Sequence, residues 1–182
     1  MSDLVRVAVD AMGGDYAPVE PVKGAVEAVN ADERVKVQLV GQVDVIEKEL
    51  QKYTYPKERV EIVPATEIIE TGEPPVNAIR HKKDSSIVVG MKKVRCGEAD
   101  AFVSSGSTGA VLVGGQTIVG RIKGVERPPL APLIPTKDGV SLLIDCGANV
   151  DARPSHLVQF AMMGSIYICL LYTSDAADEA RS

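Results

Sequence analysis

The chain has 182 residues, of which 45% are hydrophobic and 25% charged, a composition that excludes a disordered or fibrous protein. A formal net charge of −5 argues against a general binder of nucleic acids or anionic membranes, and 4% aromatic residues without tryptophan argue against stacking on bases or sugars. Three widely spaced cysteines (Cys96, Cys146 and Cys169) form neither a disulfide framework nor a metal motif, so we predict a cytoplasmic protein without metal or cofactor.

Short apolar runs alternate with helix-length segments along the chain. The apolar runs predict strands at 4–10, 35–40, 60–63, 101–104 (buried) and 141–145. The segments that follow predict helices at 21–30, 43–53, 85–97, 107–119 and 154–167, with Asp84 or Ser85 as the N-cap of the third. Repeated alternation of this kind is typical of a parallel sheet covered by helices on both faces, so the predicted fold class is α/β.

Three stretches depart from this pattern. Residues 65–80 are predicted to be the least structured, because Pro74 and Pro75 cannot continue a helix. Residues 101–120 lack charge over the length of a membrane span, but Gly, Ser, Thr and Gln make them too polar for lipid. Residues 168–182 turn abruptly acidic and alanine-rich. We therefore interpret 1–167 as the amino-terminal part of a single α/β domain and 168–182 as a disordered or artefactual tail.

The loop after the first predicted strand combines acids with paired glycines. Asp10 and Asp15 flank Gly13 and Gly14, and adjacent glycines let main-chain N–H groups approach an anion closely. The pattern is not the GxGxxG of dinucleotide-binding folds. A phosphate site and a plain tight turn with a charged rim both remain open.

The loop after the fourth predicted strand is rich in hydroxyl groups. Ser104, Gly106, Ser107 and Thr108 precede a predicted helix, whose unpaired N–H groups favour a phosphate. The lysine of a Walker loop is missing, which argues against ATP hydrolysis. Ordinary capping of the helix by a serine or threonine is the alternative.

A third polar loop, residues 145–151, follows the last predicted strand and carries Asn149, which can donate and accept hydrogen bonds. Because ligands bind outside the carboxyl ends of strands in α/β sheets, we expect all three loops to meet at one sheet edge.

Cys146 and His156 are more simply structural than catalytic or metal-binding. Among the basic clusters, the candidates for contact with a phosphate or an acidic protein are Arg121, Lys123 and Arg127. The alternative is that these residues form an ordinary solvent-exposed surface.

Several motifs occur together in order along the chain: DAMGGD at 10–15, RHKKDSS at 80–86, SSGSTGA at 104–110, GRIKG at 120–124, RPPLAPLIPT at 127–136 and DCGANVDARPSHLVQFAMMGSIY at 145–167. Over about residues 4–167 the chain resembles the bacterial phosphate acyltransferases of the PlsX type. Members of that family are considerably longer, so the resemblance implies an amino-terminal half. It departs from the usual pattern at Ser105, Ser107 and Cys146, where Ala, Asn and Val are frequent.

The resemblance implies a three-layer α/β/α sandwich with a mostly parallel sheet, related to phosphotransacetylases and isocitrate-dehydrogenase-like enzymes. It implies an enzyme that moves a fatty acyl group from acyl-carrier protein to inorganic phosphate, giving acyl phosphate for phospholipid synthesis. It further implies a cytosolic homodimer that associates peripherally with membranes.

The hypothesis for the site is that several donors grip one small oxyanion beside a reactive carbonyl. Gly13, Gly14, Ser107, Thr108 and Asn149 would supply donors to phosphate or to the oxyanion, whereas Asp10 and Asp15 would orient the loops. Two other functions stay open: a coenzyme-A-dependent phosphotransacetylase, and a non-catalytic phosphate-binding module. We expect the fragment by itself to be inactive.

Overall fold

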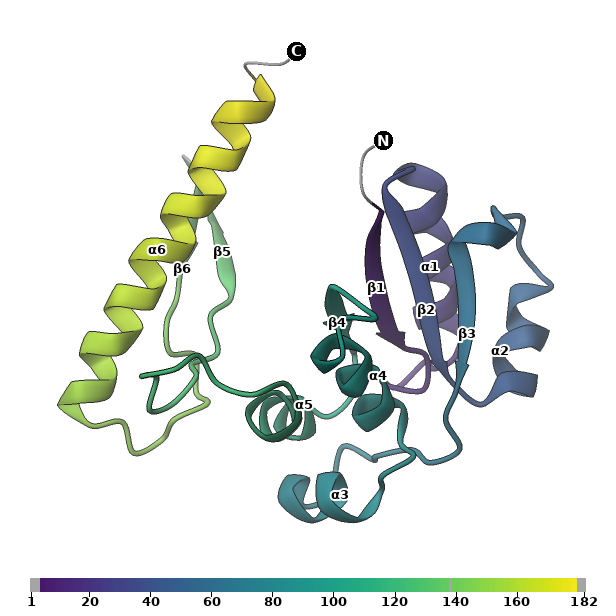
Figure 1. Ribbon diagram of the computed structural model, residues 1–182, viewed down its shortest axis with the longest axis horizontal. Coiled ribbons are helices and arrows are strands. Elements are labelled where there is room, and N and C mark those ends of the chain that lie inside the picture. Colours follow the sequence, from purple (N-terminus) through teal and green to yellow (C-terminus); the bar gives the residue numbers. More distant parts are fainter. Residues whose placement is uncertain (1–3, 138, 180–182) are drawn as a thin grey trace. The chain divides into compact units, whose positions relative to one another are not determined.

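The structure, a computed structural model, describes residues 4–137 and 139–179 (Figure 1). The chain divides into two compact units, Met1–Gly120 and Arg121–Ser182. Each unit is built around its own strands, and each is described by itself below.

A four-stranded parallel sheet forms the centre of the first unit. Its strands are β1 (Val5–Asp10), β2 (Val35–Gly41), β3 (Val60–Pro64) and β4 (Ala101–Val103). The spatial order is β3-β2-β1-β4, so β1 lies between β2 and β4, with Val9 beside both Leu39 and Val103. The prediction of a parallel sheet is confirmed for these four strands.

Helices lie on both faces of this sheet. The helices of this unit are α1 (Val19–Ala31), α2 (Val43–Leu50), α3 (Pro75–His81), α4 (Ser86–Arg95) and α5 (Thr108–Gly114), which continues as a π-helical turn (Gly115–Val119). α3 packs on α5, and α5 packs on α4. α1 and α2 pack on one face through a core that includes Val26, Leu39 and Ile46. α4 packs on the other face, where the partly buried residues Val89 and Val94 contact a core containing Ala8 and Val40. The α/β class with covered faces is confirmed.

Two local predictions for this unit have clear outcomes. Ser85 is the N-cap of α4, because its hydroxyl accepts a hydrogen bond from the Val88 N–H at 3.4 Å. The prediction that residues 65–80 are the least structured stretch is wrong at its end, where α3 begins at Pro75. Proline cannot continue a helix, but it is well suited to the first turn, where no N–H bond is lost.

Strand β4 was predicted to be buried, and this is wrong. Ala101 and Val103 are exposed, and the Val103 side chain is 52% accessible. Among the described strands β4 has β1 as its one neighbour, which makes it the edge of the sheet. An apolar strand at an uncovered edge indicates a surface that normally has a partner.

The second unit consists of a hairpin and a long helix. Strand β5 (Leu133–Thr136) pairs antiparallel with β6 (Gly139–Leu142), and α6 runs from Pro154 to Glu179. The predicted strand at 141–145 is therefore displaced and belongs to a separate two-stranded sheet, and β5 was not predicted. The helix predicted to end at Tyr167 continues to Glu179. That residues 168–182 are foreign to the protein stays a prediction.

Helix α6 is unusually apolar for its exposure. Its window Pro154–Leu171 is long and apolar enough to cross a membrane by length and composition, and 17% of that window is buried. A core helix of a soluble protein passes the same test, so the window alone does not indicate a membrane protein.

Candidate active site

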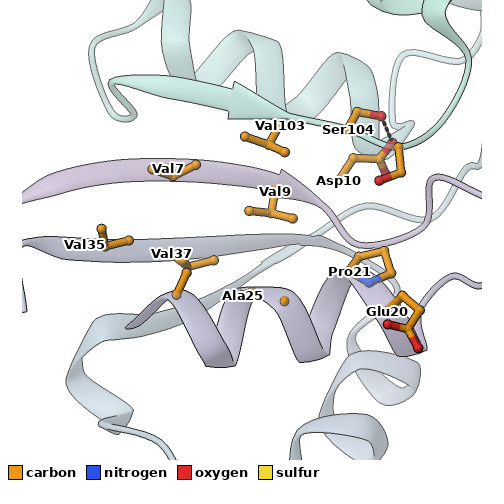
Figure 2. A pocket seen from close by; sticks show the side chains of 13 residues that line it. Val7, Val9, Asp10, Glu20, Pro21, Ala25, Val35, Val37, Val103 and Ser104 are labelled. Carbon is orange, nitrogen blue, oxygen red and sulfur yellow. Dashed lines mark hydrogen bonds between the residues drawn. The ribbon is translucent and has the colours of Figure 1, made fainter. Parts of the chain in front are cut away.

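The loops after β1 and β4 meet at one edge of the parallel sheet. The two strands are neighbours and run in the same direction, so both loops leave the sheet side by side. The Ser104 hydroxyl donates a hydrogen bond of 2.7 Å to Oδ2 of Asp10, across 94 residues of sequence (Figure 2). The predicted meeting of the glycine-bearing and hydroxyl-bearing loops is confirmed for this pair.

Asp10 organises both loops through its carboxylate. The side chain is buried, with 1% of its surface accessible. Its Oδ1 accepts a hydrogen bond from the Met12 N–H at 3.1 Å, and the Ser104 hydroxyl that binds Oδ2 itself accepts from the Gly106 N–H at 3.0 Å. Each carboxylate oxygen thus has a donor inside the protein, which satisfies a buried charge and fixes both turns.

The glycines of the first loop allow the two turns to touch. A Cβ at Gly13 would lie 2.3 Å from Oδ2 of Asp10 and 2.9 Å from the Gly106 main-chain nitrogen, so no side chain fits. Gly14 has a φ of +99°, and a Cβ there would lie 3.0 Å from Cβ of Ser105. The sequence therefore needs both glycines to bring main-chain N–H groups of two loops together.

The hydroxyl-bearing segment begins α5. Ser107 is buried and caps the helix by accepting a hydrogen bond from the Ala110 N–H at 3.3 Å, as in the alternative interpretation of this loop. Thr108 and Asp15 are exposed. The structure thus leaves the Thr108 hydroxyl open to solvent and places the Ser107 oxygen on the helix.

The loop that carries Asn149 belongs to the second unit. The Asp145 carboxylate accepts hydrogen bonds from the main-chain N–H groups of Leu130 at 2.6 Å and Asn149 at 2.7 Å. The Asn149 amide nitrogen donates to the Pro128 carbonyl at 3.2 Å and to the same carboxylate at 3.3 Å. Because β6 is not part of the parallel sheet, the expectation that all three loops follow strands of one sheet is wrong for this one.

The three basic candidates differ in their surroundings. Arg127 pairs with Asp151, Nη1 to Oδ1, at 2.6 Å. Arg121 donates to the Glu126 carbonyl, and Lys123 is exposed. Arg127 and Arg121 therefore already bind groups of their own unit.

Replacing Arg127 by alanine is expected to raise the pKa of the Asp151 carboxyl toward its ordinary value. The hydrogen bond from Arg127, and then its charge, hold that pKa below the ordinary range. A carboxyl whose folded pKa is lowered stabilises the fold above its unfolded pKa, and this contribution is lost as the pH falls through the folded pKa. An NMR titration of the Asp151 carboxyl carbon measures the change. Arg121→Ala is the control that leaves it unaltered, and an unshifted pKa in Arg127→Ala contradicts the assignment.

His156 has a structural role rather than a metal-binding one. His156 is buried, and its Nδ1 accepts a hydrogen bond from the Arg153 N–H at 3.1 Å, a structural role at the start of α6. Within residues 4–137 and 139–179, no group of three or more His, Cys, Asp and Glu side chains lies close enough to hold a metal ion.

The match to known proteins covers nearly all of the chain. Residues 5–176 match the profile of the fatty acid synthesis protein family. The chain belongs to this family. It is 51% identical over 164 residues to the phosphate acyltransferase of Alkaliphilus oremlandii and 52% identical over 163 residues to that of Clostridium beijerinckii, each covering 90% of this chain. The chain spans 48% and 49% of those proteins, about half of their length.

Similar solved structures support the α/β fold of this chain. A phosphotransacetylase from Streptococcus pyogenes is similar with a TM-score of 0.64 at 17% identity, over 87% of this chain and 51% of that protein. A phosphotransacetylase from Staphylococcus aureus has a TM-score of 0.59 at 18% identity, over 85% and 49%. At such identities the likeness concerns the fold, and it supports the predicted α/β class of the phosphotransacetylases.

Two contacts of the site go beyond the predicted roles: the Met12 N–H donates to Asp10, and the Ser104 hydroxyl binds Asp10. An aspartate that accepts from the N–H two residues later is the Asx turn, and the spacing of Asp10 and Met12 is a readable signal for it. The bond to Ser104 has no comparable signal, because it depends on which strand lies beside β1.

Proposed function

We propose that the full-length protein is a phosphate acyltransferase, which transfers a fatty acyl group from acyl-carrier protein to inorganic phosphate. The observation that carries the proposal is the 51% identity over 164 residues to a protein named phosphate acyltransferase. The contact between the two glycine-bearing loops at a strand end supports it, because such loops present main-chain N–H groups to small anions.

Phosphate would bind at the loops that carry Gly13, Gly14 and Gly106. Asp10 is a positioning residue in this proposal, because both of its oxygens already accept hydrogen bonds within the loops. Thr108 is exposed at the start of α5 and would add a hydroxyl donor.

The chemistry needs positioning more than proton transfer. A phosphate oxygen attacks the thioester carbonyl carbon; the new C–O bond forms, the C–S bond breaks, and the sulfur leaves as a thiolate that takes a proton from water. Phosphate is already an anion at neutral pH, so holding both reactants in an attacking geometry supplies most of the acceleration. One well-placed donor to the tetrahedral oxyanion is worth roughly 3–4 kcal/mol.

The remaining predicted residues keep their roles as part of the proposal. Asn149 and Ser107 would act as further donors after a rearrangement, since each now binds its own loop or helix. Arg121, Lys123 and Arg127 would contact the acidic carrier protein or phosphate, and Asp15 would orient its loop. The full-length enzyme would be a cytoplasmic homodimer of phospholipid synthesis that needs no cofactor and associates peripherally with membranes.

The test uses a full-length chimera, in which residues 1–167 of this chain are followed by the second half of the Alkaliphilus oremlandii enzyme. We expect it to form acyl phosphate, trapped as hydroxamate by hydroxylamine, from acyl-carrier protein and phosphate. Acetyl-coenzyme A in place of the carrier protein is expected to give none. A folded chimera that uses acetyl-coenzyme A and ignores the carrier protein would refute the proposal.

Replacing Cys146 by alanine in this chimera is expected to leave the rate within about threefold of the parent, because direct attack by phosphate requires no acyl-enzyme. Cys146 is half-buried in the second unit, and the alanine side chain fills much of the space of the cysteine side chain. Steady-state hydroxamate assays measure the rate. A loss of about a hundredfold with the fold intact would instead indicate a covalent intermediate.

A further inference from the structure

The basic loop, residues 121–127, is held in one shape by hydrogen bonds within the second unit. The Val125 N–H donates to the Ile122 carbonyl at 3.0 Å, which closes a β-turn with Lys123 and Gly124 at its two central positions. Gly124 has a φ of +92°, which suits glycine at the third position of such a turn. Lys123 therefore stands at the corner of a turn that the backbone itself closes.

Glu126 anchors the basic loop to helix α6. Its N–H donates to Oε1 of Gln159 at 2.9 Å, and Nε2 of the same glutamine donates to the Gly124 carbonyl at 3.1 Å. Its carboxylate Oε2 lies 3.0 Å from Nε2 of His156. Because Nδ1 of His156 accepts from the Arg153 N–H, Nε2 carries the proton of the neutral ring and donates it to Glu126. The loop is thereby bonded to two side chains of one helix.

The anchor on the helix side is packed in the interior of the second unit. His156 is 4% accessible, and its ring lies 6.4 Å from the ring of Phe160, which is 1% accessible. The Glu126 side chain is 52% accessible, so the bond to the buried imidazole is what holds it in place. A loop that is already fixed in this way loses little conformational freedom when a partner binds.

The three cations of the basic loop differ in whether their charged group is already bound. Arg127 pairs with Asp151, and Arg121 donates to the Glu126 carbonyl, so both help to shape the second unit. Lys123 is exposed and makes no ion pair or side-chain hydrogen bond with the residues at 4–137 and 139–179. Lys123 therefore presents an unpaired ammonium group on a loop of fixed shape.

The surroundings of this ammonium group favour a protein partner over a small anion. Ile122, the neighbour of Lys123 in the turn, is 76% accessible. A phosphate site needs several converging donors, whereas a lysine is a single point charge on a flexible stem. The surface of an acidic protein can use both the charge and the apolar contact.

We propose that the basic loop is a pre-formed docking element for the acidic carrier protein, with Lys123 as its contact residue and His156 and Gln159 as positioning residues. This inference rests on the proposed function, and it narrows the three basic candidates to one. Charges at the rim of an interface act mainly on the rate of association and on its salt dependence. The loop therefore speeds the capture of the acyl-carrier protein and takes no part in the chemical step.

The experiment measures binding of fluorescently labelled acyl-carrier protein to the full-length chimera by anisotropy, beside the hydroxamate assay. Lys123→Glu is expected to raise the dissociation constant about five- to tenfold at low ionic strength and less than about twofold at about 0.5 M salt, because salt screens exposed charges. The hydroxamate assay should show a raised KM for the carrier protein and a KM for phosphate like that of the parent. Lys137→Glu is the matched control, because Lys137 is an exposed lysine of the same unit outside the basic loop, and it is expected to bind like the parent.

A second pair of variants tests the positioning role of His156. His156→Ala is expected to weaken binding of the carrier protein about threefold, because the loop loses its fixed shape. His156→Gln is expected to restore binding, since glutamine can donate to Glu126 in place of the imidazole. Hydrogen–deuterium exchange at residues 122–127 of the 182-residue chain should be faster in His156→Ala than in His156→Gln. A loss of stability in His156→Ala with exchange and binding unaltered would contradict the positioning role.

The outcomes separate the docking proposal from the proposed function. Parent-like binding of Lys123→Glu in an active chimera would overturn the docking proposal and leave the acyltransferase function intact. A raised KM for phosphate with unaltered binding of the carrier protein would also overturn it, and so would a lower melting temperature with unaltered binding, which would mean that the loop packs on another part of the protein. A chimera that binds the carrier protein through Lys123 and forms no acyl phosphate would refute the proposed function alone.

Discussion

Replacing Gly13 by alanine in the full-length chimera is expected to lower acyltransferase activity by about a hundredfold, the size of effect that a displacement of about 1 Å at a reacting centre produces. The new methyl group would lie 2.3 Å from Oδ2 of Asp10 and 2.9 Å from the Gly106 nitrogen. Neither atom can retreat without breaking the bonds that join the two loops. The loops must separate, and the proposed phosphate donors separate with them.

The same substitution is expected to destabilise the fold by about 1–3 kcal/mol, as overpacking of a well-packed site does. Urea unfolding of the variant and its parent measures this, beside the hydroxamate assay. Gly115→Ala is the matched control, since a Cβ there meets nothing in the described chain, and replacing a helical glycine stabilises by about 0.5–1 kcal/mol. Full activity of Gly13→Ala would show that the contact between the loops is unnecessary for the reaction.

Much of the first unit could be predicted because local and long-range preferences agree there. The valine-rich runs of β1 and β2 pair side by side in a parallel sheet, which is the arrangement that such runs favour. Ser85 stands just before an apolar helical segment and caps it, as its position indicates. The two loops could also be placed together, because strand ends of a parallel sheet share an edge.

The failures arise where a residue pattern fits two structures. Pro75 was interpreted as a break, although proline is equally suited to a first helical turn, and α3 begins there. The apolar run at 141–145 fits a parallel strand or a hairpin. Its neighbour β5 contains Pro135, and a proline of this kind is tolerated in the edge strands of a hairpin. The local sequence does not distinguish a parallel strand from a hairpin strand, because the strand that pairs with it decides between the two.

The chemistry of the site divides in the same way. The sequence indicates which loops are polar and rich in glycine, but not which side chains form hydrogen bonds within the protein. Ser107 and Asn149 were predicted as donors to a substrate, and in the structure each holds its own segment. Ser104 was predicted to bind phosphate, and it binds Asp10. Such assignments depend on contacts between residues far apart in sequence.

Removing the Asp10 side chain is expected to have the largest effect on the site. Asp10→Ala leaves the Met12 N–H and the Ser104 hydroxyl without their acceptor in a partly buried place, which costs up to about 1–3 kcal/mol for each such group. We expect the urea midpoint to fall accordingly, and activity of the chimera to fall by about a hundredfold or more because both turns lose their anchor.

Ser104→Ala separates positioning from general damage to the fold. It removes the hydroxyl that joins Asp10 to the Gly106 N–H and keeps the Cβ, so we expect a smaller loss of stability, about 1–2 kcal/mol, and a clear loss of activity. In a double-mutant cycle the two substitutions should couple by about 1 kcal/mol or more, because they share one hydrogen bond. Ser105→Ala, at an exposed neighbour, is the control expected within about 0.5 kcal/mol of the parent. Additive effects of Asp10→Ala and Ser104→Ala would mean that the bond between them does not hold the two loops together, and the positioning role of Asp10 would have to be abandoned.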